Sequence, residues 1–187
     1  MESKDGPFLV YMARGTDGSM WGPIIEKAYA KFIGHYDRIV SGGSANEFIR
    51  TLTGLPGFTY TTKKTENPIK IITEAIRKGD IVTCGTLSNQ TINRKNLGQI
   101  GENYLQTYSI LDSIIVNDSK NNVAETFLYL RNPTGQEKNF EQFSEATDFT
   151  SHQLLQIPAA YLVSGDGTFL IKDKDFLINF PIFEISR

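Results

Sequence analysis

The chain has 187 residues, 40% of them hydrophobic, and a formal net charge of −2 at pH 7. A chain of this length can bury one ordinary core, so we expect a single domain over residues 1–187. Its lysines and arginines are scattered along the sequence, which argues against a nucleic-acid partner and against an anionic-membrane partner. The apolar run at residues 8–12 is too short for a signal peptide or a membrane anchor. A single cysteine, Cys84, excludes an internal disulfide, and we expect a soluble protein of the reducing cytoplasm.

The strongest helical pattern lies at residues 21–32, after a predicted strand at residues 8–13. Its apolar side chains recur at steps of three and four residues, which gathers them on one helical face. They are Trp21, Ile24, Ile25, Ala28, Tyr29 and Phe32. This stripe is the largest apolar face in the sequence and predicts a core helix against which later strands pack. Ser19 is placed to cap the first turn, and His35, just after the helix, is interpreted as a structural histidine.

A short helix and a strand are predicted next. Ser44 and Glu47 have the three-residue spacing of a capping box, which begins a helix that ends at Gly54. Phe58 and Tyr60 then alternate with polar residues, as in a half-buried strand.

A second helix and a buried strand follow. Asn67 and Pro68 suit the cap and the first position of a helix, and Gly79 suits its end. The strand at residues 81–86 contains Cys84. Because no histidine or arginine stands beside this thiol in the sequence, we interpret it as an inert core residue rather than a nucleophile.

Residues 104–116 and 123–131 are predicted to form an antiparallel hairpin across a polar turn. Counting outward from the centre of that turn brings position 106 opposite position 133. Gln106 and Asn132 should therefore be neighbours in space.

The carboxyl-terminal part predicts a second strand pair, at residues 160–163 and 168–171, across a Ser-Gly-Asp-Gly turn. A short helix capped by Asp173 and a last strand at residues 182–185 come after it. His152 lies in the polar stretch before this pair and is interpreted like the first histidine. Together the elements predict one α+β domain.

Several stretches of the sequence resemble the calpain family of cysteine proteases, specifically the carboxy-terminal half of the protease core. They are SKDG, MWGPIIEKAYAKFIGHYDRIVSGG, QTYSILD, LYLRNPTG and DGTFLIKDKDFLINFPIFEIS. The resemblance implies an antiparallel, barrel-like sheet with flanking helices, as in the second subdomain of the calpain core. It also implies that the first subdomain, which carries the catalytic cysteine, is absent from residues 1–187.

The resemblance implies a degenerate active site. The family has a Gly-His-Ala-Tyr-Ser pattern in the first hairpin strand, and Gln106 stands at its histidine. Asn132 occupies the position of the asparagine that orients that histidine, and Thr134 replaces the tryptophan of the family's Asn-Pro-Trp-Gly sequence. Because a carboxamide cannot act as a general base, the catalytic positions are predicted to be vestigial.

The family also binds calcium through carboxylates in this half of its core. At the matching positions this chain has Lys138, Glu145, Asp166 and Thr168. A lysine and a threonine leave too few oxygen ligands for calcium, so we expect no calcium and no other cofactor. A weak remnant at Glu145 and Asp166 is the alternative, although Asp166 is better explained as a turn residue.

The resemblance leads to three functional hypotheses. The first is a catalytically inactive domain that acts as a scaffold or protein-binding module in an intracellular assembly. The resemblance to inactive family members associated with the cytoskeleton in protists suggests a cytoskeletal or ciliary assembly. Its partner protein would cover an exposed face formed by Gln106, Tyr108, Asn132 and Thr134. The second is a calcium-dependent endopeptidase subunit completed by a chain that carries the cysteine half. The third is a pseudoenzyme that binds extended peptides by strand addition.

Overall fold

The computed structural model describes Gly15 and residues 17–40, 43–86, 106–117, 123–133, 155–162 and 167–187. The chain falls into two compact units, Met1–Gly43 and Ser44–Arg187, and each is described by itself. The predicted strand at residues 8–13 and most of the predicted Ser-Gly-Asp-Gly turn lie outside the described residues. The single domain expected from composition stays a prediction.

The first unit contains the predicted helix. α1 (Trp21–Ile33) is followed by the short α2 (Tyr36–Val40). α1 begins after Met20 without a side-chain cap, and the backbone N–H of Ser19 instead donates to Asp17 Oδ1 at 2.9 Å. The helix prediction is confirmed, whereas the cap assigned to Ser19 is wrong.

The stripe on α1 is not a core face, which corrects the prediction of a central helix. Trp21 and Phe32 are 66% and 75% exposed. The buried positions of α1 are its small residues Gly22, Pro23 and Ala30. The periodicity predicted the helix and its apolar face correctly, but periodicity alone does not show whether such a face is buried.

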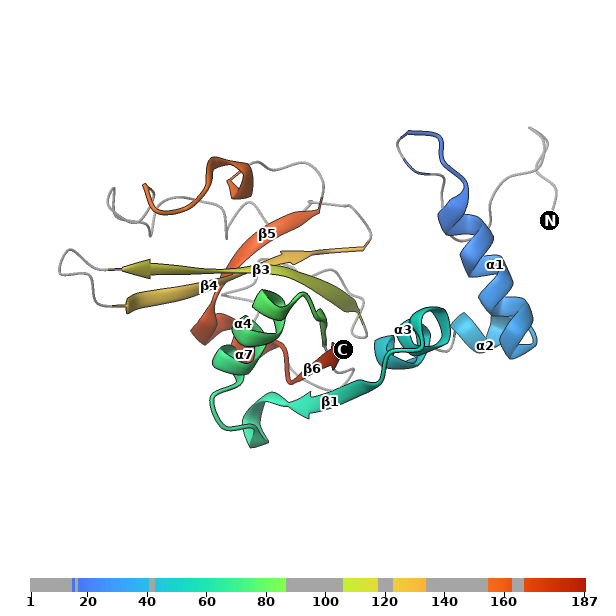
Figure 1. Ribbon diagram of the computed structural model, residues 1–187, viewed down its shortest axis with the longest axis horizontal. Helices are drawn as coiled ribbons and strands as arrows, with labels where there is room; N and C mark the ends of the chain where they lie inside the picture. Colours follow the sequence, from blue (N-terminus) through green and yellow to red (C-terminus); the bar gives the residue numbers. More distant parts are fainter. Residues whose placement is uncertain are drawn as a thin grey trace. The chain divides into compact units, whose positions relative to one another are not determined.

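The second unit is built on a six-stranded sheet with strand order β1-β6-β2-β3-β4-β5 (Figure 1). Every neighbouring pair is antiparallel. The strands are β1 (Gly57–Thr61), β2 (Ile81–Gly85), β3 (Thr107–Asn117), β4 (Val123–Arg131), β5 (Thr168–Lys172) and β6 (Ile182–Ser186). The sheet and its helices confirm the predicted α+β class with an antiparallel sheet.

The core of this unit has two parts because the strands bury side chains on both faces. Leu128 and Leu130 of β4 join one cluster, and Phe127 and Tyr129 join the other, as the two-residue period of a strand requires. The first cluster is covered by α4 (Pro68–Lys78) and α7 (Asp173–Asn179). The second includes Ile157 and contacts Tyr161, from residues 155–162.

α4 confirms both of its predicted ends. Asn67 is the N-cap by position, although its side chain makes no capping hydrogen bond, and Pro68 follows it. Gly79 ends the helix in the left-handed region at φ 82°. The backbone N–H groups of Gly79 and Asp80 bond to carbonyls of the last turn at 2.9 and 3.1 Å. Glycine at this position satisfies helix carbonyls without the steric cost that a side chain would bring.

α3 (Ala45–Thr53) is fastened to the sheet by a side chain of β6. Ser44 is the N-cap, as predicted, but makes no capping bond to the helix. Its hydroxyl donates to Glu184 Oε1 at 2.7 Å, and the backbone N–H of Asn46 bonds to Glu184 Oε2 at 3.3 Å. A remote carboxylate therefore does what the predicted capping box with Glu47 would do.

The tail differs from the prediction at residues 160–162, and Val163 lies outside the described residues. In place of a strand, the structure has the 3₁₀ helix η3 (Ala159–Tyr161), and β5 pairs with β4. β5 pairs with the edge of β4 that β3 leaves unpaired. The segment before β5 instead covers the second cluster through Ile157 and Tyr161. A short 3₁₀ helix, η1 (Thr62–Lys64), follows β1. No helix in the described part of the chain is long and apolar enough to cross a membrane.

Candidate functional site

Gln106 lies at the entrance of β3, where backbone bonds fix its position. Its N–H donates to Thr86 Oγ1 and its carbonyl accepts from the N–H of Thr86, both at 3.2 Å. These bonds extend the β2–β3 ladder, in which Gly85 pairs with Thr107. The side chain is partly exposed, so it can meet a ligand or a partner.

Asn132 follows the end of β4, and its N–H donates to the carbonyl of Gly167 at 2.8 Å. The last ladder pair before it is Ser109 with Arg131, so the predicted register, 106 opposite 133, is wrong by one residue. The cause lies at the turn, because the ladder begins with Asn117 opposite Val123 and is therefore centred on residue 120, half a residue beyond the assumed centre. The two bulges, between Ile110 and Asp112 and between Val116 and Asn117, shift the register in opposite senses and cancel.

The corrected register favours a meeting of Gln106 and Asn132 more than the predicted one does. If the ladder is extended by one pair, Asn132 falls opposite Tyr108, and Gln106 is the next residue on the same face. Such diagonal neighbours lie roughly 7–8 Å apart between their Cα atoms. The predicted register would have put the two carboxamides on opposite faces of the sheet.

Tyr108 does not belong to an exposed face, which corrects that part of the predicted partner surface. It is 2% exposed, and its ring makes edge contacts with Phe169 and Phe180 at 6.1 and 5.3 Å between centroids. Burial, together with nearby Cys84, raises the pKa of its hydroxyl. Thr134, assigned to the same surface, lies outside the described residues.

Cys84 is a core residue, as its apolar neighbours predicted. It is 1% exposed and pairs with Tyr108 across the β2–β3 ladder. Burial raises the pKa of its thiol well above the ordinary value, which disfavours the thiolate that nucleophilic attack requires. The only cysteine of this sequence is therefore unsuited to catalysis.

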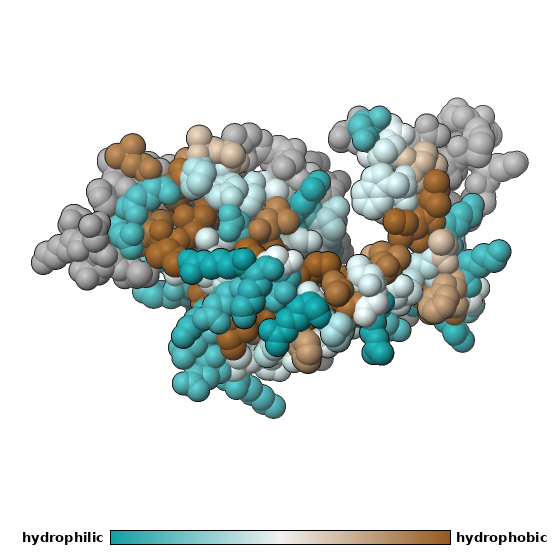
Figure 2. Space-filling model, in the orientation of Figure 1, coloured by the Kyte–Doolittle hydropathy of each residue, from teal (hydrophilic) through white to brown (hydrophobic). Residues whose placement is uncertain are grey.

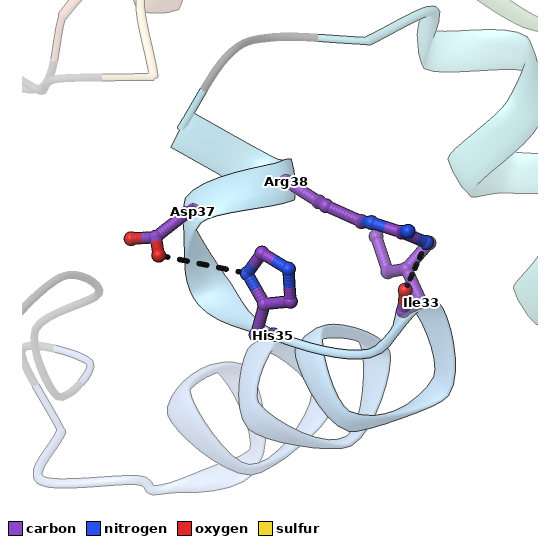
Figure 3. Close-up of polar contacts among 4 residues, drawn as sticks. All are labelled: Ile33, His35, Asp37 and Arg38. Atoms are coloured by element: carbon purple, nitrogen blue, oxygen red, sulfur yellow. Dashed lines mark hydrogen bonds and ion pairs between the residues drawn. The ribbon is translucent and has the colours of Figure 1, made fainter.

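Of the two histidines, the structure describes His35. His35 lies in the first unit, after α1, with its Nδ1 3.6 Å from the Asp37 carboxylate. Beside it, Arg38 donates to the carbonyl of Ile33 at 3.0 Å (Figure 3). Both members of the His35–Asp37 pair are exposed, so we expect the pair to contribute little to stability. His152 lies outside the described residues.

The predicted calcium positions are only partly described. Lys138, Glu145 and Asp166 lie outside the described residues. Thr168 begins β5, and its Oγ1 accepts a hydrogen bond from the Tyr129 hydroxyl at 2.7 Å. The described residues contain no group of three acidic, histidine or cysteine side chains that would hold a metal ion. The absence of calcium stays a prediction.

Sequence reasoning missed a row of polar residues that crosses all six strands. The ladder pairs align one residue from each strand: Thr59, Glu184, Thr83, Ser109, Arg131 and Thr168. No sequence motif links these six residues, which lie far apart along the chain. Only the pairing of the strands brings them into one row. Within the described residues, the buried Thr83 Oγ1 has no hydrogen-bond partner.

Comparison with protein families decides the relationship. The model of the calpain family of cysteine proteases matches residues 4–187. The chain belongs to the calpain family. It is 28% identical to mouse Calpain-9 over 185 residues, which are 96% of this chain and 26% of that protein. Against the pig Calpain-1 catalytic subunit it is 27% identical over 194 residues, or 100% of this chain and 26% of that one.

A shorter stretch is more similar to another calpain. Over 86 residues the chain is 38% identical to the human Calpain-2 catalytic subunit, covering 45% of this chain and 12% of that protein. The chain spans about a quarter of the length of the full-length calpains it matches, with 26% coverage of mouse Calpain-9. The family match therefore places Gln106 within a calpain protease domain.

Proposed function

We propose that this chain is a catalytically inactive calpain-like domain that serves as a structural or protein-binding module in a larger intracellular assembly. The observation that carries the proposal is Gln106, a carboxamide where the calpain pattern has its general-base histidine. A carboxamide neither accepts nor releases a proton near neutral pH, so it cannot generate a thiolate. This reasoning applies whichever chain supplies the nucleophilic cysteine.

The surroundings of Gln106 support the same proposal. Asn132 retains the position that orients the histidine in calpains, but a glutamine offers no imidazole to orient. Cys84 is enclosed in the core beside Tyr108, so it does not replace a nucleophile. What the two partly exposed carboxamides do offer is neutral donors and acceptors for a bound protein.

Two finer parts of the proposal follow from the family pattern. Lys138 and Thr168 stand where calpains have calcium-binding carboxylates, so we propose that the domain binds no calcium. Isothermal titration of the purified chain with CaCl₂ tests this and should give no saturable heat.

A cytoskeletal or ciliary location rests on resemblance alone, and immunofluorescence in the source cell tests it.

A turnover assay tests the inactive-domain proposal. The purified chain is incubated with Ca²⁺ and a fluorogenic calpain substrate, beside an active calpain as the positive control. We expect no turnover above the buffer rate. Calcium-stimulated turnover that disappears in a Gln106→Ala variant would overturn the proposal.

The same assay separates a subunit completed by another chain. The domain is mixed with a separately purified calpain subdomain that carries the catalytic cysteine. Turnover by the wild-type mixture would favour the endopeptidase-subunit hypothesis over ours. Turnover by a mixture containing Gln106→His, but not by the wild-type mixture, would identify Gln106 as the cause of inactivity.

A peptide-binding pseudoenzyme is the second candidate, favoured by the partial exposure of Gln106 and Asn132 at one end of the sheet. Fluorescence anisotropy of labelled, unstructured peptides measures it. Saturable binding that is lost in Asn132→Arg would support this function. Thr107→Arg is the matched control, because Thr107 is exposed on the opposite face of β3.

A further inference from the structure

The backbone of Gln106 is held by the side chain of a buried neighbour. β2 ends at Gly85, and the next residue, Thr86, is 4% exposed. Its Oγ1 accepts the N–H of Gln106 at 3.2 Å, while its own N–H donates to the Gln106 carbonyl, also at 3.2 Å. Within the described residues, Thr86 Oγ1 takes part in no other hydrogen bond. A threonine hydroxyl therefore takes the place of a backbone carbonyl and extends the β2–β3 ladder by one residue.

The backbone of Asn132 is held from the other side of the hairpin. Its N–H donates to the carbonyl of Gly167 at 2.8 Å. Gly167 directly precedes β5, which pairs with β4. Neither anchor uses the side chain of Gln106 or of Asn132, so both anchors would remain if either side chain were replaced.

Tyr108 decides on which face of the sheet the two side chains meet. It is 2% exposed and packs edge-on against Phe169 and Phe180. Alternate residues of a strand share a face, so the burial of Tyr108 commits Gln106 to the same face. On the extended ladder Asn132 lies opposite Tyr108 and diagonal to Gln106, a separation that long side chains can bridge.

We propose that Thr86 is a positioning residue that holds the backbone of residue 106 beside Asn132, so that the framework of this site is retained around the glutamine. The inference deepens the proposed function and rests on it, because it assigns the inactivity to one side chain within an intact framework. Loss of the Thr86 hydroxyl would leave the Gln106 N–H without its partner, and an unsatisfied donor removed from water is costly. Residue 106 would then move away from Asn132, although neither side chain had changed.

An imidazole placed at position 106 reports this geometry. Gln106→His is prepared with isotope-labelled histidine, and NMR follows its ring nitrogens as the pH is varied. The signals of His35 and His152 are recognised in the wild-type chain. A carboxamide oxygen that accepts a hydrogen bond from the charged ring favours the charged form, so Asn132→Ala should lower the measured pKa of the introduced imidazole by about 0.5 pH unit or more.

Two substitutions at Thr86 separate positioning from packing. Thr86→Val keeps the branched shape but has no acceptor, whereas Thr86→Ser keeps the hydroxyl. With Thr86→Val, the pKa of the introduced imidazole should no longer respond to Asn132→Ala, and with Thr86→Ser the response should be retained. In the chain that keeps Gln106, hydrogen exchange of the Gln106 amide should be about tenfold faster in Thr86→Val than in Thr86→Ser.

Thr83→Val is the matched control. Thr83 is also a buried threonine, 7% exposed, and lies on β2, but its Oγ1 has no hydrogen-bond partner. Its replacement should leave the exchange of the Gln106 amide unchanged. Circular dichroism verifies that each variant folds, and Thr86→Ala is the second hydroxyl-free variant if Thr86→Val does not fold.

Three results would overturn this inference. If the introduced imidazole does not respond to Asn132→Ala while Thr86 is present, the two positions are not adjacent. If the hydroxyl-free variants behave like Thr86→Ser in both measurements, the hydroxyl does not position residue 106. If Thr83→Val speeds the exchange as much as Thr86→Val does, the cause is a general loosening of β2. None of these measurements uses turnover, so the inactive-domain proposal is tested separately by the assay with the fluorogenic substrate.

Discussion

α1 and α4 have similar sequence patterns but opposite surroundings. Each is an amphipathic helix with lysine in its last turn. The stripe of α4 is covered by the sheet, and Ile72 at its centre is 0% exposed. In the stripe of α1, Ile25 and Tyr29 are half-buried and the other four side chains, Phe32 among them, are exposed. Figure 2 shows apolar surface over this helix. Periodicity therefore identifies an apolar face, whereas the presence of a sheet that can receive it decides whether the face stabilises the fold.

The largest expected effect comes from the buried stripe. Ile72→Ala in α4 should lower the free energy of unfolding by about 2–5 kcal/mol, because it removes a fully enclosed side chain from the core. Urea denaturation followed by circular dichroism measures the change. A loss below about 0.5 kcal/mol would mean that α4 is not packed as the structure has it, and the contrast with α1 would disappear.

The second prediction concerns the edge at which α3 approaches the sheet. A Cβ on Gly57 would lie 2.5 Å from side-chain atoms of Asn46, whose amide also bonds to Thr59 and Ser186. Gly57→Ala should therefore cost roughly 1–3 kcal/mol in the same measurement. Gly43→Ala is the control, because a Cβ on Gly43 meets nothing within 4 Å, and equal losses in both variants would reject the steric explanation.

Most of the second unit could be predicted from its sequence because local signals and tertiary packing agree there. The Asn-Pro start and glycine end of α4, the buried strand with Cys84 and the hairpin strands are examples. The strand predicted at residues 160–163 was wrong over its described part, because the apolar pattern there suits a strand as well as a segment that covers a sheet face. The outcome depended on β4 and β5, which are distant in sequence.

The candidate site could be predicted by residue but not by geometry. The family pattern selected Gln106 and Asn132, while their register depends on the centre of the polar turn, which the residue types of that turn do not mark. Tyr108 was misassigned because the site was drawn as a stretch of sequence, whereas alternate residues of a strand face opposite sides. Glu184 was missed because its partners, Ser44 and Asn46, lie far away in sequence.

The third prediction tests burial within the core through pH. The pKa of the Cys84 thiol is raised in the folded state. The contribution of this buried thiol to the free energy of unfolding is therefore fully present below the unfolded pKa of about 8.5. It is lost as the pH rises further, by at most about 1.4 kcal/mol per pH unit. Cys84→Ala should remove this part of the alkaline loss, which urea titrations from pH 7 to 10 measure. An unchanged slope would show that the thiol already titrates in the folded chain.

The smallest expected effect comes from the uncovered stripe. Phe32→Ala should change the free energy of unfolding by less than about 0.5 kcal/mol, because a side chain that is 75% exposed loses little burial when it is truncated. Ile178→Ala, at a 53% exposed position of α7, serves as the comparison in urea denaturation. A loss near 2 kcal/mol in the free chain would instead mean that Phe32 is buried in solution. In that event α1 and α4 would be alike, because both helices would bury their apolar faces.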